Sequence, residues 1–388
     1  MHVEAHPQQD KDKRASKRDS MPKPLELSLI GEWFDPHPRI LKRYLIKYYV
    51  ESNEVEMTDL TAGRRFLKRT SVPPSASISE QDCRVGGHVI LFSRNMKIVD
   101  YGDEETRQIL EASTEEMVVV VSSKAVAEGD LGEVVELLEG SAAGLQVVMM
   151  KVLGENATKR SGFSKEIASD GAVALVMQGE DSVQKARRAL ASDERYGSTV
   201  FCSATKEEAA ELKEIVLNGS ERVPPTNDNG NCTCCVIKPH AIKSRQVGAI
   251  LQSINTAGYG IDELGLFHLD ENAAREFLEV YEGGAVKNLH LMVQEMCSGP
   301  VIALRLCRSG RRSDADLSTE EVEGKNVVSS FRTEVAGPWD VEMAQELHPT
   351  SIRARYGIDN VKNAVHCTDL SNDGESECQF FFEILAGA

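Results

Sequence analysis

One ordered set of short motifs occurs twice along this chain. The first set is Val118–Val121, Leu131–Val134, Gly171–Leu175 and Arg195–Gly197, and the second is Cys235–Ile237, Val247–Ile250, Gly299–Leu304 and Arg355–Gly357. Landmarks that recur in one order indicate two related folding units. Residues 219–231, between the two sets, are rich in Asn, Gly and Pro, which predicts a linker. With 388 residues, the chain has room for these units and a further domain.

Within each set, apolar runs alternate with amphipathic segments. In the second set, runs at 235–237, 260–269 and 299–304 are separated by amphipathic segments at 246–256 and 272–281. This alternation predicts an α/β sandwich in each unit. Helices on one side of the sheet would leave strand ends and loops free to form a site.

The N-terminal part of the chain has a different pattern. Residues 1–22 are polar, which predicts an arm that is disordered or ordered only by a partner. Between 23 and 112, short β-rich runs are separated by turn-rich stretches, which predicts a small β domain. The two repeated units then occupy 113–218 and 232–388.

Charge and cysteine content limit the classes of partner. The chain has 44 basic and 61 acidic residues, a net charge of −17, which argues against binding nucleic acid or an anionic membrane by bulk electrostatics. No apolar run approaches the ~18 residues needed to span a bilayer. The start of the chain lacks a secretory pattern, so we expect a reducing compartment and nine thiols rather than disulfides. Cys232, Cys234 and Cys235 have no matching second pair, so we expect buried thiols there rather than a zinc site.

The tract Asn363–Asp369 contains the most reactive candidate, His366. A histidine nucleophile needs one neutral ring nitrogen facing phosphorus and a partner that fixes the other, a role open to Glu377. Lys238, Arg353 and Asn363 could supply donors where negative charge accumulates. Such a set could hold a triphosphate with magnesium bridging its oxygens. The alternative is a packed histidine with ordinary solvated charges nearby.

The second unit resembles the nucleoside diphosphate kinase family. The resemblance is carried by Ile237–Pro239, Ser298–Pro300, Gly337–Pro338, Ser351–Arg353 and Asn363–His366. It implies a ferredoxin-like α/β sandwich in which His366 takes the terminal phosphate of a nucleoside triphosphate and passes it to a diphosphate. It also implies magnesium carried by ATP or GTP, with no metal bound directly by the protein. The residues implied around the phosphates are Lys238, Tyr281, Arg332, Arg353 and Asn363, with Glu377 orienting the histidine.

Several positions depart from the family pattern. They are His240 in place of an aspartate, Thr333 in place of an arginine with Arg332 displaced by one, Trp339 in place of a threonine, Cys367 in place of a glycine, and no clear base-stacking aromatic near Asn288. Each lost charge-assisted donor could cost on the order of 1.5–3 kcal/mol of nucleotide binding. We therefore expect weak or absent turnover.

The first unit has no histidine, because none occurs between Val89 and Pro239. Phe201–Thr205 stands where the histidine tract is expected, with Cys202 as the remaining candidate nucleophile. With Lys124 as the counterpart of Lys238, Lys124 to Phe201 spans 77 positions against 128 from Lys238 to His366. About fifty residues of active-site segments are missing, which predicts a degenerate unit kept for its shape.

The N-terminal domain resembles a DM-ten domain, a pleckstrin-homology-like β module of axonemal proteins. The matching segments are Glu32–Pro36, Leu41–Tyr44, Val55–Asp59, Arg65–Thr70, Phe92–Arg94 and Asp100–Asp103. The overall class is therefore α+β, with a pleckstrin-homology-like domain followed by two ferredoxin-like units. One such domain before two kinase units is similar to axonemal members of the kinase family. That resemblance implies a cytoplasmic, cytoskeletal protein of ciliary and flagellar axonemes and of microtubule-organising centres.

Two functions follow as hypotheses. One is a structural component of doublet microtubules, in contact with tubulin and other doublet proteins; the other is an active kinase delivered to the axoneme by its β domain. A phosphoinositide-binding role for the β domain is a weaker third. Because tubulin tails are acidic, a chain at −17 should bind through fitted surfaces, which favours a lumenal position. The two unequal units could pair within one chain, so we expect a monomer within a larger assembly.

Overall fold

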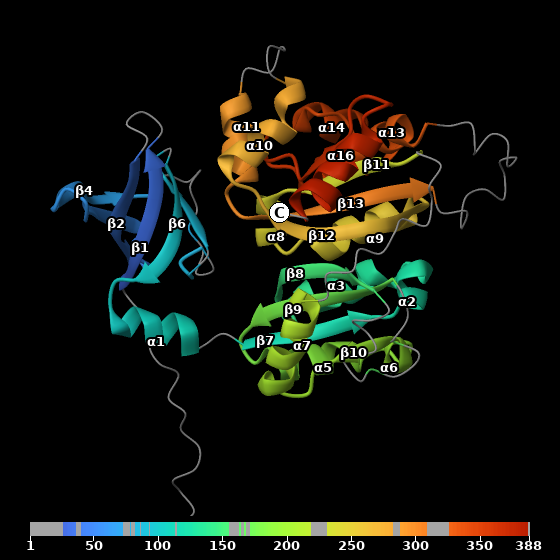
Figure 1. The fold of residues 1–388 in the computed structure, drawn as a ribbon, viewed down its shortest axis with the longest axis horizontal. Helices are drawn as coiled ribbons and strands as arrows, with labels where there is room; N and C mark the ends of the chain where they lie inside the picture. The colour runs from blue at the N-terminus through green and yellow to red at the C-terminus, as the bar shows by residue number, and fades with distance from the viewer. Residues whose placement is uncertain are drawn as a thin grey trace, which may run out of the picture.

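The structure is a computed structural model, and Figure 1 shows its ribbon. It describes residues 26–35, 40–72, 78, 82–85, 87–92, 94–112, 115–154, 163, 167, 171–218, 231–281, 288–308 and 326–386. The predicted arm at 1–22, and the predicted linker apart from Asn231, lie outside the described residues. No helix in these ranges is long and apolar enough to cross a membrane.

The N-terminal β unit is an antiparallel sheet followed by one helix. Its elements are β1 (Glu26–Asp35), β2 (Ile40–Tyr49), β3 (Glu54–Asp59), β4 (Arg64–Ser71), β5 (His88–Leu91), β6 (Arg94–Tyr101) and α1 (Glu104–Ala112). The strand order is β4-β3-β2-β1-β6-β5. Strand β3 alternates half-buried and buried residues, as expected for a sheet with one face on a core. The sheet predicted for this region is therefore present.

The first α/β unit follows in the chain. Its elements are β7 (Glu115–Val121), α2 (Ser123–Glu128), α3 (Asp130–Glu139), β8 (Gln146–Leu153), β9 (Ala172–Gly179), α5 (Ser182–Leu190), α6 (Tyr196–Thr199), β10 (Val200–Cys202) and α7 (Lys206–Asn218). The strand order is β10-β7-β9-β8, with antiparallel neighbours. This is the order of strands four, one, three and two of a ferredoxin-like sandwich.

The second α/β unit repeats that order with more helices. Its elements are β11 (Thr233–Ile237), α8 (Pro239–Lys243), α9 (Val247–Thr256), β12 (Tyr259–His268), α10 (Glu271–Phe277), η1 (Glu279–Tyr281), α11 (Leu289–Met296), β13 (Pro300–Arg308), α13 (Val327–Ser330), η2 (Phe331–Ala336), α14 (Val341–Leu347), α15 (Ile352–Tyr356), β14 (Val365–Cys367), α16 (Gly374–Gln379) and η3 (Phe380–Leu385). Strands β12, β13, β11 and β14 lie in this order in the sheet. The two α/β units predicted from the repeat are confirmed, and both have the ferredoxin-like strand order that the family resemblance implied.

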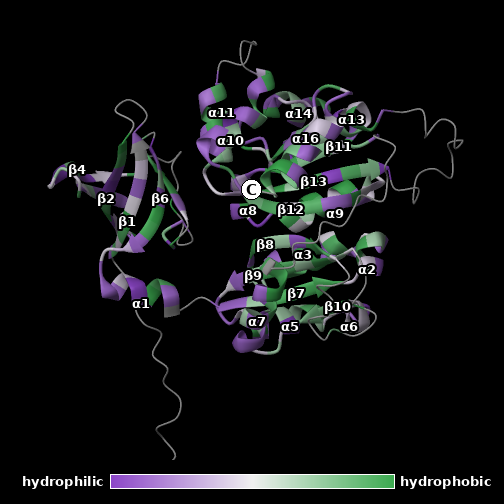
Figure 2. Cartoon of the chain, in the orientation of Figure 1, coloured by the Kyte–Doolittle hydropathy of each residue, from purple (hydrophilic) through white to green (hydrophobic). Residues whose placement is uncertain are grey.

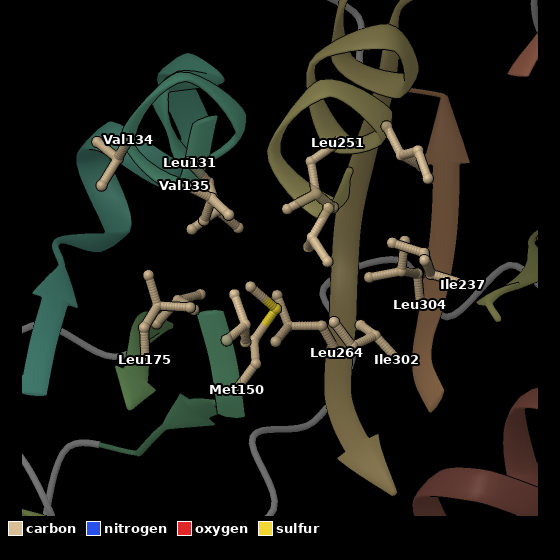
Figure 3. Packing of buried hydrophobic residues seen from close by; sticks show 14 of the residues in the cluster. Leu131, Val134, Val135, Met150, Leu175, Ile237, Leu251, Leu264, Ile302 and Leu304 are labelled. Carbon is tan, nitrogen blue, oxygen red and sulfur yellow. The ribbon is translucent and has the colours of Figure 1, made fainter. Parts of the chain in front are cut away.

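The two units form one continuous eight-stranded sheet. They join edge to edge where Gly265 of β12 pairs with Lys151 of β8. Helices α3 and α9 pack against each other over this junction, and their side chains belong to one shared apolar core (Figure 3). Figure 2 shows hydrophobic residues gathered along the central strands of both units. The pairing of the units within one chain thus comes from both sheet and helix contacts.

The expectation of helices on one side of the sheet is wrong. The shared core covers one face of both units, but the other face is also covered. In the first unit Ala209, Leu212 and Val216 of α7 cover it, packing on Val118 and Val120. In the second unit α10, α11, α16 and η3 cover it. Adjacent residues on β7 and β11 are apolar, so helices must pack on both faces of these strands to shield them from water. His366 consequently faces the second helix layer rather than an open edge of the sheet.

A buried carboxylate lies at the junction of the two units. Oε2 of Glu139, the last residue of α3, accepts a hydrogen bond of 2.9 Å from the backbone N–H of Gly248 in α9. Its Oε1 is buried without a hydrogen-bond partner among the described residues. Burial raises the pKa of Glu139 to about 8, although the backbone donors at Gly248 and Val247 oppose that rise.

We expect Glu139→Gln to increase the free energy of unfolding by about 1–3 kcal/mol at pH 8 and by much less at pH 5. The folded-state pKa lies above the unfolded value near 4.5, so wild-type stability falls as the pH rises from 4.5 through 8. Urea unfolding at the two pH values measures the difference. The exposed Glu346→Gln serves as a control without a pH-dependent gain, and an equal gain for Glu139→Gln at both pH values would contradict the expectation.

Candidate active site

His366 lies on the short strand β14 and faces the layer formed by α10, α11 and α16. It pairs with Val236 of β11, while its neighbours Val365 and Cys367 enter the shared core on the other face. The His366 side chain is only 5% exposed, and its ring packs edge-on against Phe277 with centroids 4.8 Å apart. A nucleophile in this position is fixed by the sheet and shielded from water.

A carboxylate fixes one nitrogen of this ring. Oε2 of Glu377 lies 3.0 Å from Nε2 of His366 and also accepts a bond of 2.9 Å from the hydroxyl of Thr368. When Nε2 donates its proton to Glu377, Nδ1 has a free lone pair. The orienting role predicted for Glu377 therefore matches its position. Thr368 was not predicted, and its spacing of two residues from His366 was the available signal.

Two buried cations lie next to the histidine. Lys238 Nζ donates to the carbonyl of Val361 at 2.8 Å and to Oδ1 of Asn363 at 2.7 Å. Arg353 donates to the carbonyls of Gly337 and Val365, and more weakly to Sγ of Cys367. Burial, and next the positive charge of Arg353, lower the pKa of Lys238 to about 8.

Among the described residues, the groups that accept hydrogen bonds from Lys238 and Arg353 are uncharged. Lys238 and Arg353 are 4% and 3% exposed, so their charges are neither solvated nor neutralised by a bonded carboxylate. Buried charge of one sign is costly without a counter-ion. The donor set thus fits an anionic group such as a phosphate, as the resemblance implied.

Two other predicted phosphate ligands contact a different partner. The Tyr281 hydroxyl donates to Oδ2 of Asp369, and Arg332 forms an ion pair of 3.2 Å with Oδ1 of the same carboxylate. Burial, and next the bond to Asp369, raise the pKa of Tyr281. Tyr281 lines the His366 pocket, whereas Arg332 does not. The structure brings together Lys238, Tyr281, Arg353, Asn363, His366 and Glu377, and it places Arg332 on the outer side of Asp369.

The pocket between these side chains is narrow. Its walls are Lys238, Leu278, Tyr281, Met292, Met296, Trp339, Arg353, Asn363, Val365 and His366. The free volume is about 10 Å³, the space of roughly one water molecule. Trp339 forms one wall, and its carbonyl accepts a bond of 3.2 Å from Asn363. Trp339 and Tyr281 therefore narrow the space beside His366.

The first unit has the same strand register without the chemistry. In both units a hydroxyl accepts from a strand N–H, Ser203 from Val118 at 3.1 Å and Thr368 from Cys234 at 3.0 Å. Counting back from these hydroxyls places Phe201 at the position of His366. The Phe201 ring packs under α7 against Phe163.

The prediction that Lys124 of the first unit is the counterpart of Lys238 is wrong. The backbone N–H of Ser122 donates to Thr199, as that of Lys238 donates to Ala364, so the counterpart of Lys238 is Ser122 and not Lys124. The first unit thus lacks the lysine as well as the histidine. Burial raises the pKa of Cys202 to about 11, which keeps this thiol neutral and a poor nucleophile.

Comparison with known proteins gives matches to nucleoside diphosphate kinases. The family model "Nucleoside diphosphate kinase" matches residues 231–385. "Nucleoside diphosphate kinase homolog 7" of Mus musculus is 31% identical over 397 residues, covering 92% of this chain and 93% of that protein, and its Rattus norvegicus counterpart is 32% identical over 392 residues with the same coverage. "Nucleoside diphosphate kinase" of Aquifex aeolicus (strain VF5) is 31% identical over 153 residues, which cover 39% of this chain and 94% of that protein.

The family model covers the second unit, whereas the mouse and rat proteins match nearly the whole chain. The bacterial protein has the length of one unit. Lys238, Arg353 and Asn363, from three of the motifs matched in the sequence, line the pocket at His366. This chain therefore belongs to the nucleoside diphosphate kinase family.

Proposed function

We propose that this protein is a structural component of ciliary and flagellar axonemal doublet microtubules. In this role the two kinase folds are docking modules, and phosphotransfer at His366 is weak or absent. The partners are tubulin and other doublet proteins, and microtubule-organising centres are a second place of binding. The location is the cytoskeleton of the cytoplasm, in the lumen of the doublet, without nucleic acid or membrane.

The narrow His366 pocket carries the proposal of weak turnover. Its free volume of about 10 Å³ has room for roughly one water molecule. Tyr281 and Arg332 are bound to Asp369, and Asn363 is bound to Lys238 and to Trp339. A nucleotide has to break these contacts before it gains its own, so part of its binding energy is lost.

The N-terminal unit supports the axonemal location. We propose that its six-stranded sheet with α1 is the pleckstrin-homology-like module of DM-ten type implied by the sequence. Two contacts tie this module to the second α/β unit, a hydrogen bond of 2.9 Å from Asn95 to the carbonyl of Cys297 and an ion pair between Lys243 and Asp82. A chain with all three units in contact suits a scaffold better than a tethered enzyme.

Extraction of purified axonemes tests the structural role. A component fixed inside the doublet should stay with the microtubules through a mild salt wash and leave only when the doublets are dissolved. Electrostatic contacts on an exposed surface are screened by such a wash, since the Debye length falls from about 8 Å at physiological salt to about 3 Å at 1 M. Release with the first salt wash would contradict the proposal.

The alternative function is an active kinase targeted to the axoneme. Nδ1 of His366 has a free lone pair beside two buried cations whose bonded acceptors are neutral. Family members use magnesium with nucleotides, so ATP or GTP with magnesium is the substrate in this alternative. In it, Lys238 and Arg353 stabilise charge on the transferred phosphate, and Glu377 holds the imidazole.

Labelling with γ-labelled ATP separates the two functions. We expect a small amount of acid-labile label on the wild-type chain and none on His366→Ala, because phosphohistidine is labile in acid and the first unit has phenylalanine at this position. Transfer to nucleoside diphosphate should be slow. Rapid phosphotransfer at ordinary enzyme concentrations would contradict the proposal and support the kinase.

A further inference from the structure

A second buried histidine, His240, contacts the segment that leads into His366. It lies near the N-terminus of α8, one position beyond Pro239, and its side chain is buried. Its Nε2 lies 3.2 Å from the backbone N–H of Ala364, and its Nδ1 lies 2.8 Å from Oε1 of Glu295. The same carboxylate oxygen accepts from the backbone N–H of His240 at 3.1 Å.

These contacts fix the hydrogen-bonding roles of the two ring nitrogens of His240. An amide N–H can only donate, so Nε2 of His240 must accept, and the ring proton must be on Nδ1 and point to Glu295. Burial raises the pKa of Glu295, but the hydrogen bonds from His240, the charge on His240 and the charge of Lys362 together outweigh it, and the net effect is a lowered pKa. The His240 ring is thus held in one orientation, with Nδ1 directed at Glu295 and Nε2 at the Ala364 amide.

The peptide that His240 holds has a rare backbone conformation. Ala364 has φ of +68°, a left-handed conformation that a residue with a β-carbon seldom adopts. Its N–H is bound by His240, and its carbonyl accepts from the N–H of Lys238 at 2.9 Å. Such a conformation persists where the surroundings supply several contacts that hold it. Ala364 is two residues before His366, so its peptide sets the direction in which β14 leaves the loop.

The first unit is an internal control for this arrangement. Its counterpart of Ala364 is Thr199, whose carbonyl accepts from Ser122 in the same way. Thr199 does not have a positive φ, and the position matching His240 holds Lys124, whose side chain is exposed. The left-handed peptide and its histidine therefore occur in the unit that has the nucleophile and not in the unit that has Phe201.

We propose that His240 and Glu295 are positioning residues that hold the Ala364 peptide left-handed and thereby aim the His366 ring at the phosphate position. The pair does not touch the phosphate position itself, and it acts through the backbone of residues 364–366. This role rests on the proposed function in one respect, because labelling of His366 can be measured only if the site is phosphorylated. Protection of the Ala364 amide from hydrogen exchange can be measured whether or not His366 is phosphorylated.

Two substitutions at one position test the role in the full chain. His240→Leu removes the acceptor, whereas His240→Gln places a side-chain oxygen close to the position of Nε2. We expect hydrogen–deuterium exchange at the Ala364 amide to be at least tenfold faster in His240→Leu, and acid-labile labelling of His366 to fall by a similar factor. His240→Gln should restore both. Thermal unfolding of each variant shows whether the chain remains folded.

The outcomes are distinct. Unchanged protection of Ala364 in a folded His240→Leu, or equal loss in both variants, would overturn the positioning role. If His240→Leu does not fold, Glu295→Gln replaces it as the test variant. We then expect faster hydrogen exchange at the Ala364 amide, although His240 itself is intact. Unchanged exchange at this amide would overturn the positioning role. Rapid phosphotransfer by the wild-type chain would contradict the proposed function and leave the exchange result to decide the role of His240.

Discussion

Replacing Trp339 by threonine is expected to raise the rate of His366 phosphorylation by about 10–100-fold. The indole forms a wall of a pocket with about 10 Å³ of free volume, where a triphosphate has to enter. Threonine removes this bulk and adds a hydroxyl donor, and one hydrogen bond to a charged group contributes on the order of 1.5–3 kcal/mol. If that energy is realised in the transition state, the rate rises by roughly tenfold per 1.4 kcal/mol. Acid-labile label from γ-labelled ATP measures the rate.

The matched control is Trp339→Phe, which keeps an aromatic wall and adds no donor. Trp339 is 37% exposed, so neither substitution opens a large cavity in the core. We expect Trp339→Phe to resemble the wild-type chain and Trp339→Thr combined with His366→Ala to carry no label. A Trp339→Thr variant as slow as the wild type would show that Trp339 does not limit access to His366.

Gly248→Ala is expected to lower the free energy of unfolding by about 3 kcal/mol. A β-carbon on Gly248 would lie 2.2 Å from the backbone nitrogen of Glu136, at the crossing of α9 and α3. Neither atom belongs to a flexible side chain, so the helices must separate and lose part of the shared core. In a folded body of this size the loss corresponds to a decrease in Tm of roughly 6–12 °C, measured by calorimetry.

Two further substitutions complete this test. Gly132→Ala should act in the same direction, since its β-carbon would lie 2.6 Å from the backbone nitrogen of Gln252. Gly197→Ala should be neutral, because no atom lies within 4 Å of the β-carbon it would add. If Gly248→Ala is as stable as Gly197→Ala, the packing of α3 on α9 does not hold the two units together.

Much of the fold was predictable because apolar periodicity reports local structure directly. The expected amphipathic segment at 246–256 is α9, and the expected runs at 260–269 and 299–304 contain most of β12 and β13. The repeat was visible because its two copies keep the same glycine-containing landmarks. Gly132 and Gly248 belong to them for a physical reason, namely the close crossing of α3 and α9.

The remaining features depend on contacts between distant segments. The edge-to-edge pairing of β8 and β12 leaves no pattern in either strand, and α7 covers the second face of the first sheet without any motif. The counterpart of Lys238 was misassigned because a lysine occurs two positions after Ser122, in the first turn of α2. Backbone hydrogen bonds to Thr199 and Ala364 were needed to correct it.

The site shows the same division. Residue types at family positions predicted the group around His366, and the structure brings most of them together. The role of Asp369 was not predictable, because it depends on the distance between three side chains from separate segments, Tyr281, Arg332 and Asp369 itself. The left-handed peptide at Ala364 was hidden for another reason, since alanine rarely adopts positive φ.

A density map of native doublet microtubules tests the central claim most directly. We expect the continuous eight-stranded sheet, β10-β7-β9-β8-β12-β13-β11-β14, to be visible against tubulin inside the doublet. We also expect the indole of Trp339 in the His366 pocket and no nucleotide there. Doublets without this chain, or a chain bound outside them with a nucleotide beside His366, would contradict the account.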